Sequence, residues 1–398
     1  MSPNAFPDPR AGAVRDLWLL DPAVTFLNHG SFGACPRAVL EAQQRLRDRI
    51  EREPVRFLVR ELEPLLDAAR GELAAFVGAD PEDLVFVPNA TAGVNTVLRS
   101  LSLGPDDELC VTDHEYNASR NALDAAAARA GARVVVAPVP FPIAAPEQVV
   151  EAVLARVGPR TRLVLVDHVT SPTGLVFPVA SLISELTRRG VDVLVDGAHA
   201  PGMLPLDLGA LGAAYYTGNC HKWMCAPKGA GFLHVRRDRQ ASIRPLAISH
   251  GSNSPRTDRS RFLLEFGWTG TADPSALLCV PEAIRAMGAL LPGGWPALRG
   301  HNRATALAAR DLLCEALGCS PPAPDAMIGA LAAVPLPGAP SSPPRLDPLQ
   351  DALLERWGIE VPVFAWPAPP RRLLRISAQI YNDRPQYERL AEALTALL

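Results

Sequence analysis

The chain has 398 residues, of which 48% are hydrophobic and 20% are charged, as is typical of a globular protein. This length exceeds what one ordinary hydrophobic core holds, so two domains are expected. A formal net charge of −3 without long runs of one sign argues against a nucleic-acid partner and a membrane-surface role. No apolar stretch reaches about 18 residues, so no membrane span is expected.

The cysteines and the N-terminus predict a reducing, cytoplasmic location. Seven cysteines are an odd number and form no CxxC pair, which favours buried thiols over a zinc site, and no bound metal is expected. The first 15 residues contain Pro, Asp and Arg but lack the apolar core of a signal peptide.

The pattern of predicted elements divides the chain into three parts, beginning with a Pro- and Ala-rich N-terminal arm at 1–24. In the large domain, 25–270, apolar residues at helical spacing dominate 37–77, and short apolar runs then alternate with amphipathic segments. The expected strands are 84–87, 109–112, 133–139, 163–167, 191–196, 213–217 and 231–235, and the expected helices include 92–101, 119–130, 146–156 and 179–189.

This alternation predicts an α/β fold with a mostly parallel seven-stranded sheet, which binds ligands beyond the carboxyl ends of its strands. Residues 271–398 are expected to form a smaller α+β C-terminal domain, in which 337–348 is a Pro- and Ser-rich connection. Its predicted helices are 281–291, 302–317, 348–357 and 386–398, and its predicted strands are 328–336, 359–364 and 373–377.

One lysine and one aspartate carry the central hypothesis. Lys222 lies in a turn after the run 213–217, and Asp196 ends the apolar run 191–196. A lysine amine can hold the aldehyde of pyridoxal 5′-phosphate (PLP) as a Schiff base, and an aspartate can keep the pyridine nitrogen protonated so that the ring accepts electrons. The pair therefore predicts a PLP enzyme, with Lys228 in a turn signature as the competing lysine.

Each further candidate also has an ordinary structural explanation. The segment 89–95 opens a helix after a strand, where free N–H groups suit a phosphate, but Asn and Thr are also common helix caps. Tyr116 suits stacking on a flat ring or a rim position, and His199 suits a place by the cofactor's phenolic oxygen or a capping role. Arg375 in an apolar strand needs an anion, either a substrate carboxylate or a structural salt bridge.

Seven stretches, which jointly are specific, resemble the class V aminotransferase family of fold-type I PLP enzymes, and within it the isopenicillin N epimerase-like branch. They are LNHGSFG at 27–33, PNATAGVN at 88–95, DHEYNA at 113–118, VDGAHAPG at 195–202, YTGNCHKW at 216–223, WTGTADPS at 268–275 and LRISAQ at 374–379. The resemblance implies the fold of a fold-type I PLP-dependent transferase.

The resemblance also implies a role for each matching residue. Lys222 would hold the cofactor and move protons at the substrate α-carbon, and Asp196 would bind the pyridine nitrogen. Tyr116 would stack on the ring, and His199 would lie by the ring oxygen. The residues expected at the phosphate are Thr91, Ala92, Asn219 and His221, joined by Thr271 from the neighbouring subunit of an obligate homodimer. The residues expected at the substrate are Arg375, which takes its carboxylate, and Asn28, His29 and Ser171.

The motifs leave the reaction and the substrate open. Epimerisation at the α-carbon of an amino acid or an amino-acid-derived metabolite is the leading hypothesis, a C–S β-lyase acting on a cysteine conjugate is the alternative, and an aminotransferase is the third. Epimerisation needs a second acid or base opposite Lys222, for which Tyr116 and His29 are candidates. A persulfide-forming cysteine desulfurase is disfavoured, because 361–367 lacks the cysteine that such enzymes carry near their final strands.

Two further alternatives concern the site as a whole. A non-catalytic scaffold of this fold would be expected to lose Lys222 or Asp196, and both are present. The stretch 240–266 is either a mobile lid that favours an acidic distal group on the substrate or a solvated loop. Its basic residues are Arg244, His250, Arg256, Arg259 and Arg261.

Overall fold

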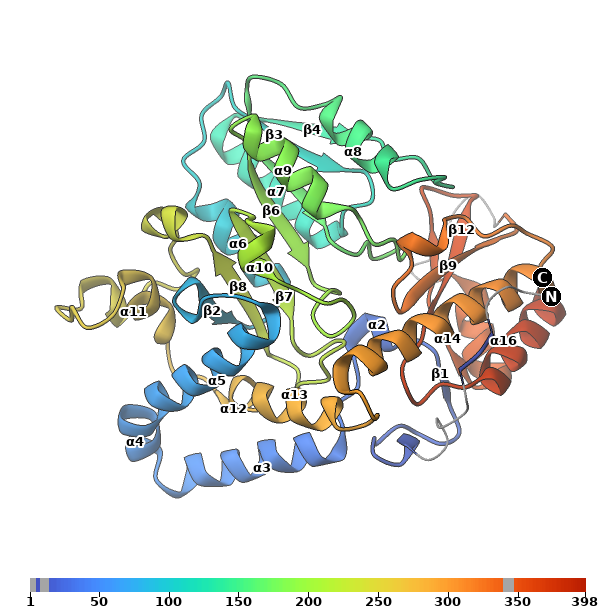
Figure 1. Cartoon of the computed structure of the whole chain (residues 1–398), viewed down its shortest axis with the longest axis horizontal. Helices are drawn as coiled ribbons and strands as arrows, with labels where there is room; N and C mark the ends of the chain where they lie inside the picture. The colour runs from blue at the N-terminus through green and yellow to red at the C-terminus, as the bar shows by residue number, and fades with distance from the viewer. Residues whose placement is uncertain (1–4, 8–13, 339–346) are drawn as a thin grey trace.

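The computed structural model describes residues 5–7, 14–338 and 347–398, so the predicted arm 1–24 and connection 337–348 lie partly outside the described residues. Figure 1 shows the strands of the central sheet on one side of helix α2 (His29–Phe32) and the strands β9 (Leu331–Leu336) and β12 (Arg372–Ser377) on the other. None of the described helices combines the length and apolar character that a membrane-spanning helix needs.

The central sheet has seven strands in the order β2-β8-β7-β6-β5-β3-β4. All neighbours are parallel except that β8 is antiparallel to both β2 and β7, so the predicted mostly parallel seven-stranded sheet is confirmed. The strands are β2 Leu84–Val87, β3 Glu108–Thr112, β4 Arg133–Ala137, β5 Thr161–Asp167, β6 Asp192–Gly197, β7 Tyr215–Asn219 and β8 Gly231–Val235.

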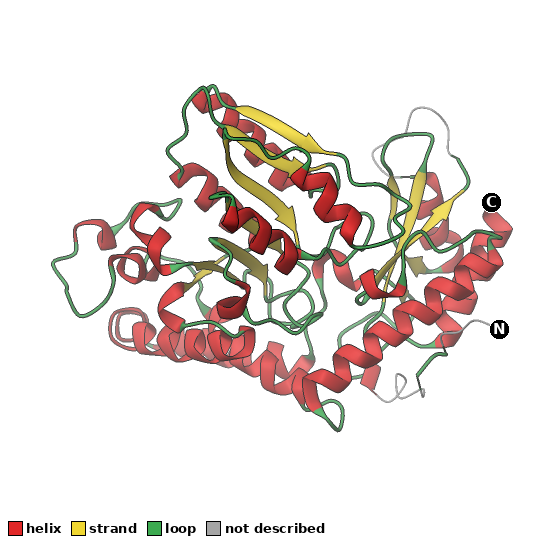
Figure 2. Ribbon diagram, turned by 45° about the horizontal axis from the view of Figure 1, so that its top comes forward, coloured by secondary structure: helices red, strands yellow, loops and turns green. Residues whose placement is uncertain are grey.

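Helices cover both faces of this sheet, as Figure 2 shows. Successive strand residues point to opposite faces, so Leu163 and Leu165 pack with one apolar cluster while Val164 and Val166 pack with the other. The first cluster includes side chains of α6 (Ala90–Ser100), α7 (Asn117–Ala130) and α11 (Arg261–Gly267). The second includes those of α8 (Glu147–Leu154) and α9 (Val179–Arg188), and the short α10 (Leu208–Leu211) precedes β7.

An N-terminal helical layer packs beside β2 and against the first helices of the C-terminal half. It contains α3 (Arg37–Arg52), α4 (Pro54–Arg56), a π-helical turn (Phe57–Glu61) and α5 (Leu62–Val77), against which α12 (Ser275–Leu278) and α13 (Val280–Gly288) pack. Pro54 begins a helix as expected. Pro64 instead lies within a continuous helical run, just after the π-helical turn Phe57–Glu61, so its missing N–H falls next to this wider turn.

The C-terminal part has a three-stranded antiparallel sheet in the order β11-β12-β9, with bounds Val363–Ala365, Arg372–Ser377 and Leu331–Leu336. Its helices are α14 (Gly294–Ala316), α15 (Pro348–Trp357) and α16 (Arg384–Leu397). The strand predicted at 359–364 is two strands, because β10 (Ile359–Glu360) leaves this sheet and pairs in parallel with β1 (Thr25–Phe26).

Helix α14 begins at Gly294, well before the predicted start at 302. The sequence Gly293-Gly294-Trp295-Pro296 resembles a loop, but a proline in the first turn of a helix lacks only an N–H that has no intrahelical partner. The domain boundary at residue 270 stays a prediction, and the pairing of β1 with β10 ties the start of the predicted large domain to the C-terminal part.

Candidate active site

The predicted site residues follow strands that end at one edge of the central sheet. Asp196 lies at the end of β6, Asn219 ends β7, and Lys222 follows β7 after a short turn. Because β5, β6 and β7 are parallel, their carboxyl ends meet at the same edge. This is where open α/β sheets bind ligands.

Lys222 has the properties of a reactive amine. Its Nζ lies 3.0 Å from His199 Nε2. Burial lowers the pKa of Lys222 to about 7, and the nearby Arg375 guanidinium lowers it further against the weaker opposing effect of Asp196 and Asp167. A lysine with this pKa is substantially uncharged at neutral pH, and the neutral amine is the form that adds to an aldehyde.

His199 is oriented by the residue that follows Lys222. The indole N–H of Trp223 donates to His199 Nδ1 at 3.4 Å. Burial, together with the nearby Lys222, keeps the pKa of His199 well below its usual value, so the ring is neutral. A neutral ring that accepts at Nδ1 carries its proton on Nε2. His199 therefore donates to the lone pair of Lys222 Nζ, which again requires the amine to be unprotonated.

The N-terminal segment holds the turn that carries Lys222. His29 is fully buried, its Nε2 lies 3.1 Å from the Lys222 carbonyl oxygen, and its Nδ1 lies 2.6 Å from the Tyr381 hydroxyl. Gly33 has φ +70°, and a Cβ there would clash with the His221 carbonyl oxygen. Both residues thus contact the backbone of the turn that carries Lys222. The hydrogen bonds of the His29 ring go to the Lys222 carbonyl oxygen and to Tyr381, and none goes to the Lys222 amine.

Asp196 is buried at the end of β6. Its carboxylate accepts hydrogen bonds from Ser119 Oγ at 2.7 Å and from the Ala198 N–H at 3.0 Å. Burial raises the pKa of Asp196, which these hydrogen bonds and Lys222 oppose. A protonated ring nitrogen beside this carboxylate would favour its ionised form.

The predicted phosphate residues surround the start of α6. Asn89 caps this helix by accepting from the Ala92 N–H at 2.9 Å, and Asn219 Oδ1 accepts from the Ala90 N–H at 2.8 Å. Thr91 lies between Ala90 and Ala92 at the helix start, where N–H groups and the helix dipole favour an anion. His221 uses Nδ1 to contact the Ala230 carbonyl oxygen at 3.1 Å, which leaves Nε2 for a further partner.

Arg375 is 1% exposed and forms no ion pair with an acid in the described part of the chain. Its guanidinium donates to the Ser171 carbonyl oxygen at 2.7 Å and to Ser31 Oγ at 3.0 Å, and it lies 5.1 Å from the centre of the Phe364 ring. Burial lowers its pKa to about 10. The salt bridge that would have explained this residue structurally is absent among the described residues, so no described acid balances its positive charge.

The structure shows no hydrogen bond from Asn28, Tyr116 or Thr271 to Lys222 Nζ among the described residues, and the effect of burial, which lowers the pKa of Arg375, is opposed by the nearby Tyr116. Asn28 accepts from Ser31 Oγ at 2.5 Å and donates to Glu360, so it supports the serine that Arg375 contacts. Tyr116 is 44% exposed at the start of α7, and Thr271 is exposed in the loop between α11 and α12. This single chain therefore does not show Thr271 in contact with the Lys222 site.

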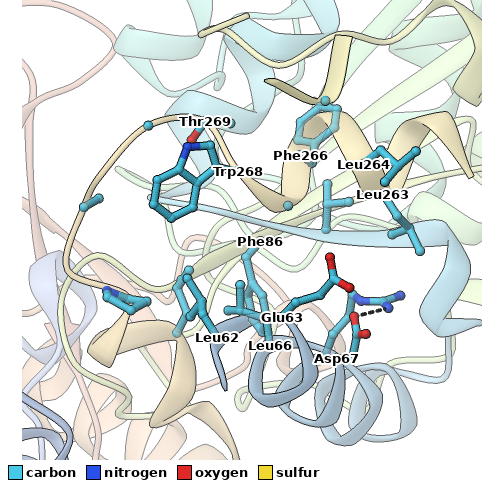
Figure 3. A pocket seen from close by; sticks show the side chains of 18 of the residues that line it. Leu62, Glu63, Leu66, Asp67, Phe86, Leu263, Leu264, Phe266, Trp268 and Thr269 are labelled. Carbon is cyan, nitrogen blue, oxygen red and sulfur yellow. Dashed lines mark hydrogen bonds and ion pairs between the residues drawn. The ribbon is translucent and has the colours of Figure 1, made fainter. Parts of the chain in front are cut away.

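The arginines of the stretch 240–266 are engaged with acids of α5 and α11. Arg256 pairs with Glu63 at 2.8 Å, and Arg259 pairs with Asp67 at 2.6 Å. They border a cavity of about 570 Å³ between α5, β2 and α11, where Figure 3 shows Leu62, Leu66, Phe86 and Trp268 as apolar walls. Because their charges are already balanced, these two arginines offer little attraction to an acidic group of a substrate.

Several supporting residues had no clear sequence signal. Ser119 lies just beyond the motif 113–118, and Ser31 lies within the motif 27–33, where nothing in the sequence predicts its contact with Arg375. Tyr381 comes from the C-terminal part and meets His29 only in the folded chain. A buried strand aspartate and a buried strand arginine each need partners, but the sequence does not say which hydroxyls supply them.

The arrangement fits PLP. Lys222 with its lowered pKa, the buried Asp196 and the start of α6 meet at one edge of the central sheet, and Arg375, which comes from β12 of the C-terminal sheet and has no acidic partner among the described residues, lies near Lys222. Lys222 and Asp196 would hold the aldehyde and ring-nitrogen ends of the cofactor, and the start of α6 would hold its phosphate. Bound PLP supplies an electron sink that stabilises negative charge at the substrate α-carbon.

The fold and the site define a PLP-dependent enzyme of fold type I. A family model described as Aminotransferase class-V matches residues 34–283. The isopenicillin N epimerase of Amycolatopsis lactamdurans is 41% identical, with 96% of this chain and 98% of the relative covered. An L-cysteine desulfhydrase of Arabidopsis thaliana is 30% identical, with 94% of this chain and 88% of the relative covered.

The solved structure of the cystine C-S lyase C-DES in complex with cysteine persulfide matches the fold with a TM-score of 0.77. The match covers 94% of this chain and 97% of the C-DES chain, at 24% sequence identity. The chain belongs to the class V aminotransferase family, and its cofactor is PLP. The predicted family, fold class and cofactor are confirmed.

The lowered pKa of Lys222 makes cofactor uptake depend on pH. Cofactor-free protein is expected to bind added PLP at a rate that rises with pH and levels off above about 7, because the neutral amine reacts. A solvated lysine would level off only above about 10. Arg375→Met should move the midpoint to higher pH, since removing a neighbouring cation raises the pKa of Lys222. Stopped-flow absorbance measures both; a midpoint near 10 in the unmodified protein would contradict the assignment.

Proposed function

We propose that the chain catalyses epimerisation at the α-carbon of an amino acid or an amino-acid-derived metabolite, in the manner of its isopenicillin N epimerase relative. The observation that carries this proposal is the pairing of Lys222, whose pKa burial lowers to about 7, with a nearby buried Arg375 that has no acidic partner among the described residues. Arg375 would hold the substrate carboxylate, which orients the α-proton toward the amine of Lys222. Similarity to the epimerase, at 41% identity over nearly the whole chain, favours this reaction.

The roles of the other site residues follow from their positions. Asp196 would keep the ring nitrogen protonated, and the Nε2–H of His199, which donates to Lys222 Nζ, would lie by the ring oxygen. The phosphate would be bound by Thr91, Ala92, Asn219 and His221. The substrate side would include Ser171, whose carbonyl oxygen and hydroxyl both contact Arg375, with Asn28 and His29 as supporting residues.

Epimerisation needs a proton donor on the face opposite Lys222, and Tyr116 suits this role better than His29. His29 is fully buried, burial lowers its pKa to about 3, and both ring nitrogens already have partners. Tyr116 is partly exposed and forms no side-chain cap for α7, so its ring and hydroxyl are available. We therefore assign Tyr116 both the stacking role and the second proton transfer.

A C–S β-lyase is the second candidate, and the similarity to an L-cysteine desulfhydrase supports it. Elimination needs one base at the α-carbon, which Lys222 supplies, and a leaving group on the β-carbon. It needs no proton donor on the opposite face. The same site can therefore perform either reaction, and the orientation of the substrate decides between them.

Product analysis separates the two reactions. The holoenzyme is incubated with amino acids, peptides with a free α-amino group, and cysteine conjugates, and products are resolved by chiral chromatography. We expect a mixture of the two α-epimers from a preferred substrate, with the carbon skeleton intact. Release of pyruvate and a thiol from a cysteine conjugate, without any epimer, would overturn the epimerase proposal in favour of the lyase.

The proposed assembly is a cytoplasmic homodimer in which Thr271 contacts the phosphate of the partner's cofactor. Thr271 is exposed, and its neighbours Gly270 and Ala272 line the same cavity as Val59, an apolar residue that is 75% exposed. An exposed apolar side chain next to a functional loop suits a subunit interface. All seven cysteines are free, which suits a reducing compartment.

Mixed dimers test the role of Thr271. Thr271→Ala is expected to weaken PLP binding about tenfold through the loss of one hydrogen bond to a charged group. In a heterodimer of Lys222→Ala and Thr271→Ala chains, the one intact lysine should face an intact Thr271 from the other chain and bind PLP normally. Light scattering measures the mass of the holoenzyme, and PLP titration measures the cofactor affinity of each dimer. A monomeric holoenzyme would contradict the proposal.

A further inference from the structure

Asp196 lies in a cluster of three buried carboxyl groups. Asp196 and Asp167 are paired across the parallel strands β6 and β5, so their side chains lie on the same face of the sheet. Glu115, just after β3, completes the cluster. One carboxyl oxygen from each residue lies within 4.8 Å of the others, and all three residues are less than 9% exposed.

Two of these acids have oxygens without hydrogen-bond donors among the described residues. Both carboxyl oxygens of Glu115 and Oδ2 of Asp167 are buried without a partner, whereas Asp196 accepts from Ser119 and from Ala198. An ionised carboxylate that is buried without donors is strongly disfavoured, while a protonated one is a neutral group that can itself donate. The two acids therefore differ in kind from Asp196.

The charges around the cluster lead to the same conclusion. Burial raises the pKa of Glu115 well above its usual value, and the neighbouring Asp167 and Asp196 raise it further. Burial and Asp196 do the same to the pKa of Asp167. The groups that oppose this rise are Arg120 for Glu115, Lys222 for Asp167, and for both acids the Tyr116 backbone N–H, which lies near them without a well-formed hydrogen bond to either Glu115 oxygen or to Asp167 Oδ2. Arg120 is already paired with Asp124 at 3.0 Å.

A metal ion explains the cluster less well than protons do. Mg²⁺ and Ca²⁺ take six or more oxygen ligands, so three carboxyl groups would leave several positions to be filled by water inside a buried cluster, and Zn²⁺ prefers nitrogen and sulfur. The cluster offers three carboxyl groups, of which Asp196 already accepts two hydrogen bonds from the protein.

We propose that Glu115 and Asp167 are protonated acids that position Asp196, so that a single negative charge faces the ring nitrogen of the cofactor. This role rests on the proposed function of Asp196 as the partner of that nitrogen. The two acids are positioning residues, since neither is proposed to touch the substrate. Because Glu115 and Asp167 carry protons, the negative charge of the cluster resides on Asp196. Each proton also gives a buried carboxyl group, which lacks a donor from the backbone, a hydrogen that it can itself donate.

The first test measures the protons independently of the cofactor. A raised pKa in the folded state means that the protonated acid stabilises the fold fully below the unfolded pKa of about 4, and that this stability is lost as pH rises toward the folded pKa. A glutamine has no proton to lose in this range, so full-length cofactor-free Glu115→Gln should not lose this part of its stability as pH rises. We therefore expect the folding equilibrium constant of the variant, divided by that of the unmodified protein, to increase between pH 5 and 8 by up to about tenfold per pH unit.

Glu108→Gln is the matched control for this measurement. Glu108 is a buried glutamate on β3, but it pairs with Arg133 and Arg160, and the hydrogen bond from Arg133 lowers its pKa. Glu108→Gln should therefore be less stable than the unmodified protein at neutral pH, whereas Glu115→Gln should be more stable than it there. A flat difference between Glu115→Gln and the unmodified protein across the pH range would show that Glu115 is ionised in the fold and would overturn the proposal.

The second test measures positioning in the holoenzyme. Glu115→Gln and Asp167→Asn keep a neutral group with a donor, so PLP affinity and the pH profile of its absorption should stay within about threefold of the unmodified protein. Glu115→Ala removes the donor and should weaken PLP binding about tenfold. Equal losses in the amide and alanine variants would overturn the proposal, as would one equivalent of bound metal by elemental analysis that Glu115→Gln abolishes. A failure of PLP to bind at all would overturn the proposed function, while the first test would still report the protons.

Discussion

Lys222→Ala is expected to abolish the covalent attachment of PLP and to reduce the rate of α-proton exchange by about 10³-fold or more. The reason is that Lys222 has two tasks, which are to hold the cofactor aldehyde and to move the substrate proton. Its lowered pKa, its 3.0 Å contact with His199 and the support of its carbonyl by His29 all serve these tasks. The visible absorption of the purified variant and its exchange rate measure the two losses separately.

Lys228→Ala is the matched control, because Lys222 and Lys228 are the only two lysines in the sequence. Lys228 donates to the Gly33 carbonyl oxygen at 3.0 Å, so its loss should weaken the packing of the N-terminal segment but leave the cofactor attached. Borohydride reduction followed by peptide mass spectrometry then has two possible sites to distinguish. Cofactor found on Lys228, or a visible band that survives in Lys222→Ala, would refute the assignment.

Arg375→Met is expected to lower kcat/KM by about 10²-fold or more while the cofactor stays bound. The guanidinium is buried and has no acidic partner among the described residues, and its hydrogen bonds to Ser31 and Ser171 fix its direction. A substrate carboxylate would be the missing anion, and a flexible apolar side chain cannot replace the pair of charge-assisted hydrogen bonds. Steady-state kinetics should show most of the loss in KM.

Arg372→Met controls for a general effect on the same strand. Arg372 lies three residues earlier in β12 and pairs with Asp347 at 2.9 Å, so its charge is already balanced. Its loss should lower the melting temperature slightly and leave KM unchanged. If the two variants raise KM equally, or if Arg375→Met leaves KM unaltered, the substrate carboxylate does not bind at Arg375.

The sequence pattern predicted those parts of the fold that depend on local periodicity. The strand runs of the large domain were found to within two residues at each end, because buried parallel strands are short and continuously apolar. The same reasoning failed where tertiary contacts decide. The run 359–364 gave two strands because β1 offers Ile359 and Glu360 a different partner, and Gly294 starts a helix because Pro296 suits its first turn.

The sequence likewise predicted the two central residues of the candidate site but not the partners that surround them. Lys222 and Asp196 stood out because a lysine after one strand and an aspartate at the end of another have a defined chemical use together. The partners that tune them are far apart in sequence, as His29 and Tyr381 illustrate, so no local pattern could place them. Asp167 ended its predicted strand just as Asp196 did, yet only the register of β5 and β6 shows that the two acids lie side by side.

The most direct test of the account is proton NMR of substrates incubated with the holoenzyme in D2O. The central claim is that Lys222 moves a proton at the α-carbon of an amino-acid substrate that Arg375 holds. We predict that the α-proton signal of a preferred substrate disappears while the signals of its carbon skeleton remain, that Lys228→Ala preserves this exchange, and that Lys222→Ala abolishes it. Exchange that persists without Lys222, or turnover of a substrate whose α-proton is never exchanged or removed, would contradict the claim.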